Sequence, residues 1–269
     1  MRLDEVRGFV FDVDGTLVHR AGAEVRVIPG AREVLERVRA SGRPYALFTN
    51  GSHVPPAALA GELRETGLPI ADEELLTPLC SVQTYLERFR GNARVLPLLT
   101  DSAHRYLEAA GVRLVDGSNG ASVDAVFVAQ PGRADFDLLE LAARTVIAGA
   151  RLLTGSYVAA YAGADGPILS RGAMATAAIA KASGARPVVV GKPSHAAVRA
   201  MRDRLGVPSE ELAVVGDDLF LDVALGHLGR STTVLVRSGI SRALDLSRVP
   251  QKRRPHHAVD SVADLLEWL

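Results

Sequence analysis

Short runs of apolar residues alternate along the chain with longer segments in which apolar residues recur every three or four positions. The short runs predict strands, and the longer segments predict amphipathic helices. Strands that alternate with helices favour a parallel sheet covered by helices on both faces. The pattern therefore predicts an α/β fold built on a doubly wound parallel sheet.

The strands of this sheet are expected at the two ends of the chain. The first two are predicted at Gly8–Phe11 and Pro44–Thr49. After a long interval, three more are predicted at Pro187–Val190, Leu212–Val215 and Thr232–Val236. We therefore expect the two ends of the chain to form one domain.

Helices are expected between and after these strands. The segment PGAREVLERVRASG predicts a helix with Pro29 in its first turn and Gly42 at its C-terminal cap. Further helices are predicted in HAAVRAMRDRLG and in VADLLEWL, which closes the chain.

The middle of the chain has its own alternation of predicted strands and helices. The alternation is seen in the segments ARVLPLL, DSAHRYLEAAG, VDAVFVA and DFDLLELAARTVIAGARLL. This alternation is enough for a separate α/β unit. We therefore expect residues 1–77 and 186–269 to form one domain and residues 78–185 to form a smaller inserted domain.

Composition and charge exclude several classes of partner. Lys+Arg and Asp+Glu both number 31, so the formal net charge is zero and no overall field attracts nucleic acid or an anionic membrane. No apolar run approaches the ~18 residues that a membrane span requires. The single cysteine, Cys80, excludes an intramolecular disulfide and fits a reducing compartment. We expect a soluble, cytoplasmic protein with no nucleic-acid or membrane partner.

Polar residues cluster where the predicted strands end. They are Asp12, Asp14, Thr49, Asn50, Gly51, Lys192, Asp217 and Asp222. Each cluster alone has a structural explanation, because Asp, Asn and Gly favour turns and acidic residues favour helix N-termini. The carboxyl ends of strands in a doubly wound sheet share one crevice, however, so these residues are expected to converge there.

The chemistry of the clusters suits a cation and an anion together. Carboxylates bind hard cations, and Mg²⁺ commonly bridges a few carboxylates to a substrate phosphate. Lys192 and the Thr49-Asn50-Gly51 segment offer the donors that an anion needs. The sequence therefore predicts a site that holds an anion beside a hard cation, and Mg²⁺ is the cofactor that suits its composition.

Four motifs, DVDGTL, TNGS, GKPS and GDDLFLD, resemble those of the haloacid dehalogenase (HAD) superfamily of hydrolases. The interval between Asp14 and Thr49 is too short for an inserted domain, whereas the interval between Thr49 and Lys192 is long. That spacing is similar to the NagD-type phosphatases, class IIA of the superfamily. The resemblance implies a Rossmann-like core with an inserted α/β cap, and a homodimer through the cap is possible. It also implies that the anion is the phosphate of a small phosphorylated metabolite.

The resemblance also implies a role for each aspartate of the first motif. Asp12 is expected to attack phosphorus and form an aspartyl-phosphate, which divides a difficult hydrolysis into two displacements. Asp14 is expected to protonate the leaving alcohol and then to activate water. The side chains of Asp12 and Asp217 and the backbone carbonyl of Asp14 are the expected Mg²⁺ ligands.

The remaining motif residues are expected to hold the phosphate. Thr49, Asn50, Gly51 and Lys192 are the expected ligands of the phosphoryl oxygens, and Lys192 is also expected to keep Asp12 ionised. Asp222 is expected to support the lysine or the metal. Asp218 is interpreted as a helix-start residue.

Two alternatives to a phosphatase stay open. The same aspartyl-phosphate passed to another hydroxyl would make a phosphotransferase or mutase. A protein that binds a phosphorylated ligand without turnover would be a catalytically retired member of the superfamily.

The substrate is not defined by the sequence, because residues 154–173 depart from the family pattern. NagD-type relatives often carry Thr-Asn-x-Asp where this chain has Thr-Gly-Ser-Tyr from Thr154. The nearby candidates for substrate contact are Tyr157, Tyr161, Asp165 and Arg171. Core packing is an equally good interpretation of the two tyrosines.

Overall fold

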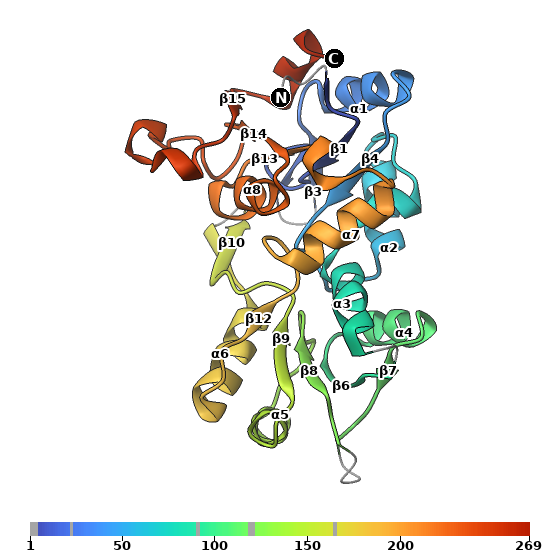
Figure 1. The fold of residues 1–269 in the computed structure, drawn as a ribbon, viewed down its shortest axis with the longest axis vertical. Helices are drawn as coiled ribbons and strands as arrows, with labels where there is room; N and C mark the ends of the chain where they lie inside the picture. Colours follow the sequence, from blue (N-terminus) through green and yellow to red (C-terminus); the bar gives the residue numbers. More distant parts are fainter. Residues whose placement is uncertain (1–4, 22–23, 90–91, 118–121, 164–165) are drawn as a thin grey trace.

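The computed structural model describes residues 5–21, 24–89, 92–117, 122–163 and 166–269. The molecule has two lobes that follow one another along its longest axis, each built around its own sheet (Figure 1). Both ends of the chain lie in the upper lobe as drawn in Figure 1.

The upper lobe contains, within the described residues, a six-stranded sheet in the order β15-β14-β13-β1-β4-β5. All neighbouring strands are parallel, and Phe11 at the end of β1 lies between Val215 of β13 and Leu47 of β4. The chain passes from β1 to β4 on one side and later to β13 on the other, so β1 is a topological switch point. The strands are β1 (Gly8–Phe11), β4 (Tyr45–Phe48), β5 (Leu75–Leu76), β13 (Leu212–Gly216), β14 (Thr232–Val236) and β15 (His257–Val259).

Helices cover both faces of this sheet, because alternate residues of a strand point to opposite sides. Phe9 and Phe11 of β1 belong to a buried cluster shared with α1, α2 and η8. Val10 belongs to another, shared with α7 and α8. The helices are α1 (Ala31–Ala40), α2 (Pro56–Glu65), α7 (His195–Leu205), α8 (Ala224–Gly229) and the 3₁₀-helix η8 (Val262–Glu267).

The lower lobe contains, among the residues described, a five-stranded parallel sheet in the order β12-β9-β8-β6-β7. Phe127 of β8 packs in a cluster with residues of α3 and α4, whereas Val126 and Val128 pack with α5 and α6 on the other face. The strands are β6 (Arg94–Leu98), β7 (Arg113–Leu114), β8 (Ala125–Val128), β9 (Arg151–Thr154) and β12 (Val188–Val189). The helices are α3 (Pro78–Leu86), α4 (Asp101–Ala109), α5 (Phe136–Ile147) and α6 (Arg171–Ser183).

Two antiparallel hairpins stand apart from the sheets. The first, β2 (Val18–Ala21) and β3 (Glu24–Val27), follows the loop after β1, and the second, β10 (Ala160–Gly163) and β11 (Gly166–Leu169), lies at the boundary between the lobes in Figure 1. Short helical turns complete the chain. They are η2 (Asp72–Glu74), η3 (Glu87–Phe89), η4 (Ser209–Glu211), the π-helix η5 (Leu219–Val223), η6 (Leu246–Arg248) and η7 (Gln251–Arg253).

The structure confirms the predicted α/β class and its doubly wound parallel sheet. The prediction that Pro187–Val190 forms a strand of the upper sheet is wrong. Only Val188–Val189 forms a strand, and it pairs with β9 of the lower sheet. An apolar run indicates a strand but does not indicate which strand it pairs with. In this structure β12 follows α6 in the chain and pairs with β9 at the edge of the lower sheet. The prediction that Pro29 lies in the first turn of a helix is also wrong. Helix α1 begins after Gly30, which is its N-cap residue and has a φ of 84°. The domain bounds stay a prediction.

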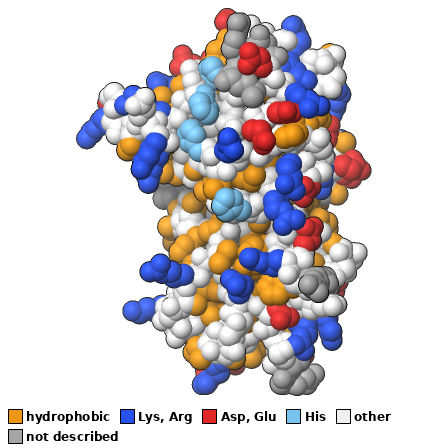
Figure 2. Space-filling model, viewed as in Figure 1, with side chains coloured by type: hydrophobic (Ala, Val, Ile, Leu, Met, Phe, Trp, Pro, Cys, Tyr) orange, Lys and Arg blue, Asp and Glu red, His pale blue; other side chains and the backbone are white. Residues whose placement is uncertain are grey.

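Charge is distributed over the surface as the zero net charge suggests. Figure 2 shows basic and acidic side chains interspersed over most of one face, with basic side chains on the arm that carries η6 and η7. No helix of the described residues is long and apolar enough to cross a bilayer.

Candidate active site

The loop after β1 places its two aspartates in different environments. The amide of Asp12 extends the sheet by donating to Val215 O at 2.8 Å, and the chain then reverses at Gly15, whose φ is 88°. Only glycine adopts that conformation without strain. Asp12 is consequently 9% exposed, whereas the side chain of Asp14 is 48% exposed.

Lys192 joins two aspartates at the centre of the site. Its Nζ donates to Oδ1 of Asp12 at 2.6 Å and to Oδ1 of Asp222 at 2.7 Å, and the lysine is 3% exposed. Burial disfavours the ammonium, but the two carboxylates outweigh burial and raise the pKa of Lys192 above its ordinary value. The second oxygen of Asp12 accepts from Thr16 Oγ1 at 3.1 Å. The Asp12 carboxylate is thus fixed from both sides.

The loop after β4 is connected to the backbone of Lys192. Asn50 Oδ1 accepts from the Lys192 amide at 2.8 Å, and Asn50 Nδ2 donates to the Lys192 carbonyl at 3.0 Å. The Gly51 amide donates to Thr49 Oγ1 at 3.0 Å. Asn50 therefore positions the lysine in this structure, and the expected phosphate contacts of Thr49, Asn50 and Gly51 stay a prediction.

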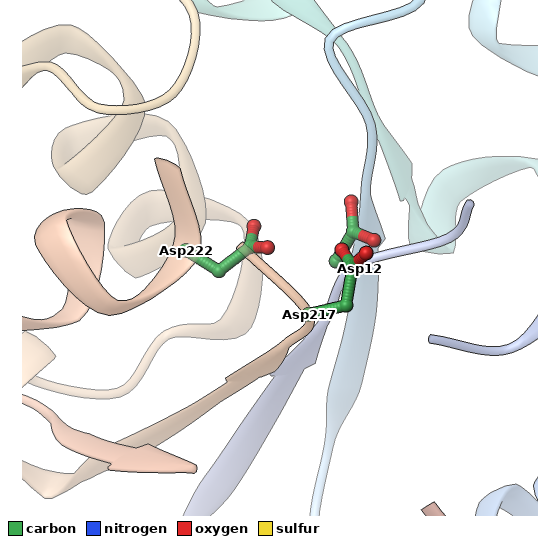
Figure 3. Close-up of side chains that lie close together, drawn as sticks. All are labelled: Asp12, Asp217 and Asp222. Carbon is green, nitrogen blue, oxygen red and sulfur yellow. The ribbon is translucent and has the colours of Figure 1, made fainter. Parts of the chain in front are cut away.

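Asp217 enters from the end of β13, next to Asp12 (Figure 3). Its Oδ2 accepts from the Ile240 amide at 2.6 Å. A Cβ on Gly15 would lie 2.4 Å from that oxygen, and one on Gly239 would lie 1.8 Å from it. Two glycines therefore give the carboxylate its space.

The donor set fits a hard divalent cation. Asp12, Asp217 and Asp222 each offer a carboxylate oxygen, and the three atoms lie within 4.8 Å of one another (Figure 3). Burial, followed by the charges of Asp12 and Asp222, raises the pKa of Asp217 above its ordinary value. That shift reflects burial first and neighbouring negative charge second, and a bound cation would offset both by stabilising the ionised carboxylate.

The two remaining aspartates of the last motif, Asp218 and Asp222, have different roles in the structure. Asp218 accepts from the amides of Phe220 and Leu221 at 2.7 and 3.2 Å, which is the helix-start role expected for it. Asp222, 2% exposed, accepts from Lys192 and from the Asp218 amide. Asp222 is thus a hydrogen-bond partner of Lys192, and its expected role in supporting the lysine or the metal stays a prediction.

Asp14 makes a contact that the sequence did not indicate. Its Oδ1 accepts from Arg20 Nε at 2.6 Å, and Arg20 Nη1 also donates to Glu62 on α2. Burial is the largest cause of a pKa of Asp14 above its ordinary value; the charge of Arg20 opposes it and that of Asp12 adds to it. The sequence carries no signal for this contact, because it depends on how β2 and α2 pack beside the loop after β1.

The candidate substrate residues at 154–173 that the structure describes contact other residues of the lower lobe or are exposed. Tyr157 and Tyr161 are 44% and 41% exposed, so the interpretation as core residues is wrong. Tyr161 accepts from Gln130 at 3.4 Å, and Arg171 donates to Gly132 O at 3.2 Å. Asp165 lies outside the described residues.

One backbone contact joins this segment to the lysine loop. The Gly191 amide donates to Gly155 O at 3.1 Å, and a Cβ on Gly191 would lie 2.2 Å from that oxygen and 2.6 Å from Asn50 Oδ1. Glycine at 191 therefore permits the loops that carry Gly155, Asn50 and Lys192 to meet.

Comparison with known proteins identifies the family to which the chain belongs. A model described as haloacid dehalogenase-like hydrolase matches residues 9–113, and a HAD-hydrolase-like model matches residues 189–265. Ribonucleotide monophosphatase NagD of Escherichia coli K12 is 30% identical, covering 97% of this chain and 98% of its own length. The chain belongs to the haloacid dehalogenase-like hydrolases.

Other HAD-like relatives agree with that assignment. Dihydroxyacetone phosphatase of Corynebacterium glutamicum strain R is 28% identical, covering 96% of this chain and 90% of that protein. The structure of p-nitrophenyl phosphatase from Archaeoglobus fulgidus superposes with a TM-score of 0.86 at 27% identity, covering 98% of this chain and all of the other. The predicted NagD-type subgroup is confirmed, and the chain is a phosphoric monoester hydrolase of the HAD type.

Proposed function

We propose that this protein is a Mg²⁺-dependent phosphatase that hydrolyses a small phosphate monoester through an aspartyl-phosphate on Asp12. The observation that carries the proposal is the setting of the Asp12 carboxylate. It lies at the end of the central strand, 2.6 Å from Lys192 Nζ and within 4.8 Å of the carboxylates of Asp217 and Asp222. A structural turn would not require a buried lysine and three carboxylates together.

In the first step, an Asp12 oxygen forms a bond to phosphorus as the bond from phosphorus to the ester oxygen breaks. Asp14 delivers its proton to the departing oxygen, so an alcohol leaves. Lys192, with its raised pKa, stays charged and binds phosphoryl oxygens together with Thr49, Asn50 and Gly51. In the second step, Asp14 takes a proton from water as that water displaces Asp12 from phosphorus and releases inorganic phosphate.

Mg²⁺ would be held by the side chains of Asp12 and Asp217 and the Asp14 backbone carbonyl, with Asp222 behind Lys192. When bound, it neutralises charge between the carboxylate nucleophile and the dianionic phosphate. The cluster of Asp12, Asp217 and Asp222 supports this assignment, because oxygen ligands of this kind suit Mg²⁺.

A panel of phosphate esters, assayed with and without Mg²⁺, tests the function. The relatives that are named as dihydroxyacetone phosphatase and ribonucleotide monophosphatase justify including triose phosphates and nucleoside monophosphates. Phosphate release that requires Mg²⁺ is the expected result. Binding without turnover would favour a phospho-ligand-binding protein, and phosphoryl transfer to an added alcohol in preference to water would favour a phosphotransferase.

Trapping tests the intermediate separately. Borohydride reduces an aspartyl-phosphate to homoserine, so enzyme quenched during turnover and then reduced should carry homoserine at position 12 by peptide mass spectrometry. Homoserine at another aspartate would place the nucleophile elsewhere.

We further infer that residues 78–185, whose sheet is completed by β12, act as a cap over the core formed by residues 1–77 and by the chain that follows β12, and that two copies associate through their caps. Phe136 on α5 and Met174 on α6 are 88% and 51% exposed, which supports an apolar contact on this side of the lower lobe. Light scattering should report about twice the 28.5 kDa chain mass. A species of 28.5 kDa at all concentrations would reject the dimer.

A further inference from the structure

Arg20 connects the proposed proton donor to a helix that has no part in the chemistry. Its Nε donates to Oδ1 of Asp14 at 2.6 Å, and its Nη1 donates to Oε1 of Glu62. Arg20 comes from β2 of the first hairpin and Glu62 from α2, so the guanidinium joins β2 to α2 directly and also binds the Asp14 carboxylate. None of the four family motifs includes Arg20 or Glu62.

We propose that Arg20 is a positioning residue for Asp14, held in place by Glu62. The inference rests on the proposed phosphatase mechanism, in which Asp14 gives its proton to the leaving oxygen. Arg20 binds Oδ1 and so leaves Oδ2 as the oxygen that faces the leaving group. Proton delivery depends on that orientation, because a catalytic group works only within hydrogen-bond reach of its target.

The geometry favours orientation over a contribution to folding. The side chains of Arg20, Asp14 and Glu62 are 32%, 48% and 37% exposed, and ion pairs this open to solvent add little to the free energy of unfolding. A planar guanidinium with two carboxylates, however, fixes direction as well as distance. A displacement of about 1 Å in a catalytic group can cost on the order of 100-fold in rate.

The position of Arg20 on its strand makes the contact stable. Val18 and Arg20 lie on the same face of β2, and Val18 is fully buried, so the hairpin is anchored two residues before the arginine. Val18 also pairs with Val27 of β3, which fixes the register of the hairpin. The Arg20 backbone is therefore held in place independently of its side-chain contacts.

The test compares two esters in Arg20→Gln. The ratio kcat/KM reports events up to the first irreversible step, so it reports phosphoryl transfer and not breakdown of the aspartyl-phosphate. For an alkyl ester such as propyl phosphate, kcat/KM should fall about 10-fold, because the alkoxide needs the proton. For p-nitrophenyl phosphate, whose phenolate leaves without one, the fall should be at most about two-fold.

A matched control lies on the same hairpin. Arg26 on β3 donates to both oxygens of Glu24 at 2.8 Å, and Arg26→Gln removes an arginine–glutamate pair without touching Asp14. This variant should behave as the wild type with both esters. Glu62→Gln, which leaves the Arg20–Asp14 contact in place, should change the alkyl-to-aryl ratio in the same direction as Arg20→Gln by a smaller factor.

Inhibition by inorganic phosphate distinguishes positioning from substrate binding. Phosphate has no leaving group, so its inhibition constant should be the same in Arg20→Gln and in the wild type. An equal fall for both esters, or a rise in the phosphate inhibition constant that matches the fall, would overturn the inference. Hydrolysis of both esters by the wild type, measured first, tests the proposed function itself.

Discussion

The site at the end of β1 and the segment of residues 154–173 contrast in how their side chains are held. At the first, Asp12, Lys192 and Asp222 are each less than a tenth exposed and are joined by short charged hydrogen bonds. At the second, Tyr157 and Leu169 are 44% and 62% exposed. The first region is fixed before any ligand arrives, whereas Tyr157 and Leu169 of the second are open to solvent.

This difference explains why the structure indicates the type of reaction but not the identity of the substrate. Charged groups act on a developing charge most effectively when they need not reorganise, which is why the phosphate end of the site is buried and connected. Tyr157 and Leu169 have no comparable burial to hold their side chains before a ligand binds. The reaction is therefore readable from the fixed region, whereas the substrate has to be found by experiment.

Removal of the nucleophile should have the largest effect. Asp12→Asn keeps the size of the side chain but cannot form the acyl phosphate, so kcat should fall by about 10⁴-fold or more. Because the Asn oxygen can still accept from Lys192 and its NH₂ group can donate to the Thr16 hydroxyl, the variant should still unfold cooperatively. Steady-state kinetics and thermal unfolding followed by circular dichroism measure the two effects. Near-normal turnover would exclude the covalent mechanism.

Removal of the metal from the site at the end of β1 should lower activity by a comparable factor. EDTA should reduce activity to background and Mg²⁺ should restore it, whereas Ca²⁺ should restore little because its bonds are longer and its coordination number is higher. Activity titrations with each cation provide the measurement. Full activity in chelator would remove the metal from the mechanism.

Asp14→Asn should divide substrates by their leaving groups. Alkyl esters should lose about 10²–10⁴-fold in phosphoryl transfer, because the amide has no proton of suitable acidity to give. With p-nitrophenyl phosphate the transfer should survive better, and breakdown of the aspartyl-phosphate should become limiting. Rapid mixing should then show a burst of nitrophenolate. Equal losses of the transfer step with no accumulating phosphoenzyme would mean that Asp14 only shapes the loop.

A smaller effect should follow when the space around Asp217 is filled. The Cβ of Gly239→Ala would lie 1.8 Å from Asp217 Oδ2, so the carboxylate has to move and Mg²⁺ affinity should fall by about 10–100-fold. Gly132→Ala is the control, since nothing lies within 4 Å of its Cβ. Calorimetric titration of Mg²⁺ into each variant reports affinity without turnover. Equal affinities would mean that Asp217 is not a metal ligand.

The smallest effect should come from the exposed region. Tyr157→Ala should change kcat/KM by less than about 10-fold, with factors that differ from one ester to another, because loss of a half-exposed contact removes little binding energy. Inhibition by inorganic phosphate should stay unchanged, since phosphate does not reach beyond the fixed region. The same factor for every ester would show that Tyr157 supports the fold of the loop and not the leaving group.

The sequence predicted those parts of the molecule that depend on local pattern. Gly8–Phe11 and Thr232–Val236 form strands with the expected bounds, because buried parallel strands are short, continuous apolar runs. Asp12, Lys192, Asp217 and Asp222 were expected to converge, and the structure brings them together because β1 and β13 are neighbours and Lys192 lies in the loop that precedes α7.

Features that depend on pairing between distant segments were not predicted. The sheet to which Val188–Val189 belongs is decided by the free edge of β9, which no pattern within that segment encodes. The contact of the Ile240 amide with Asp217 arises from a loop after β14, and the Arg20–Glu62 contact needs both the hairpin register and the place of α2. Ile240, Arg20 and Glu62 lie outside the four motifs, so the sequence around them does not indicate these contacts.

The double hydrogen bond between Asn50 and Lys192 has a consequence for how the protein is made. The two residues are 142 positions apart, and the lower sheet lies between them in the sequence. On a ribosome, Asp12 and Asn50 emerge early, whereas Lys192 and Asp217 follow only after nearly all of the lower lobe has been synthesised. Until then β1 lacks its neighbour β13, so a nascent chain exposes an unpaired apolar edge. The inserted segment thus sets the time during synthesis when the upper sheet can close.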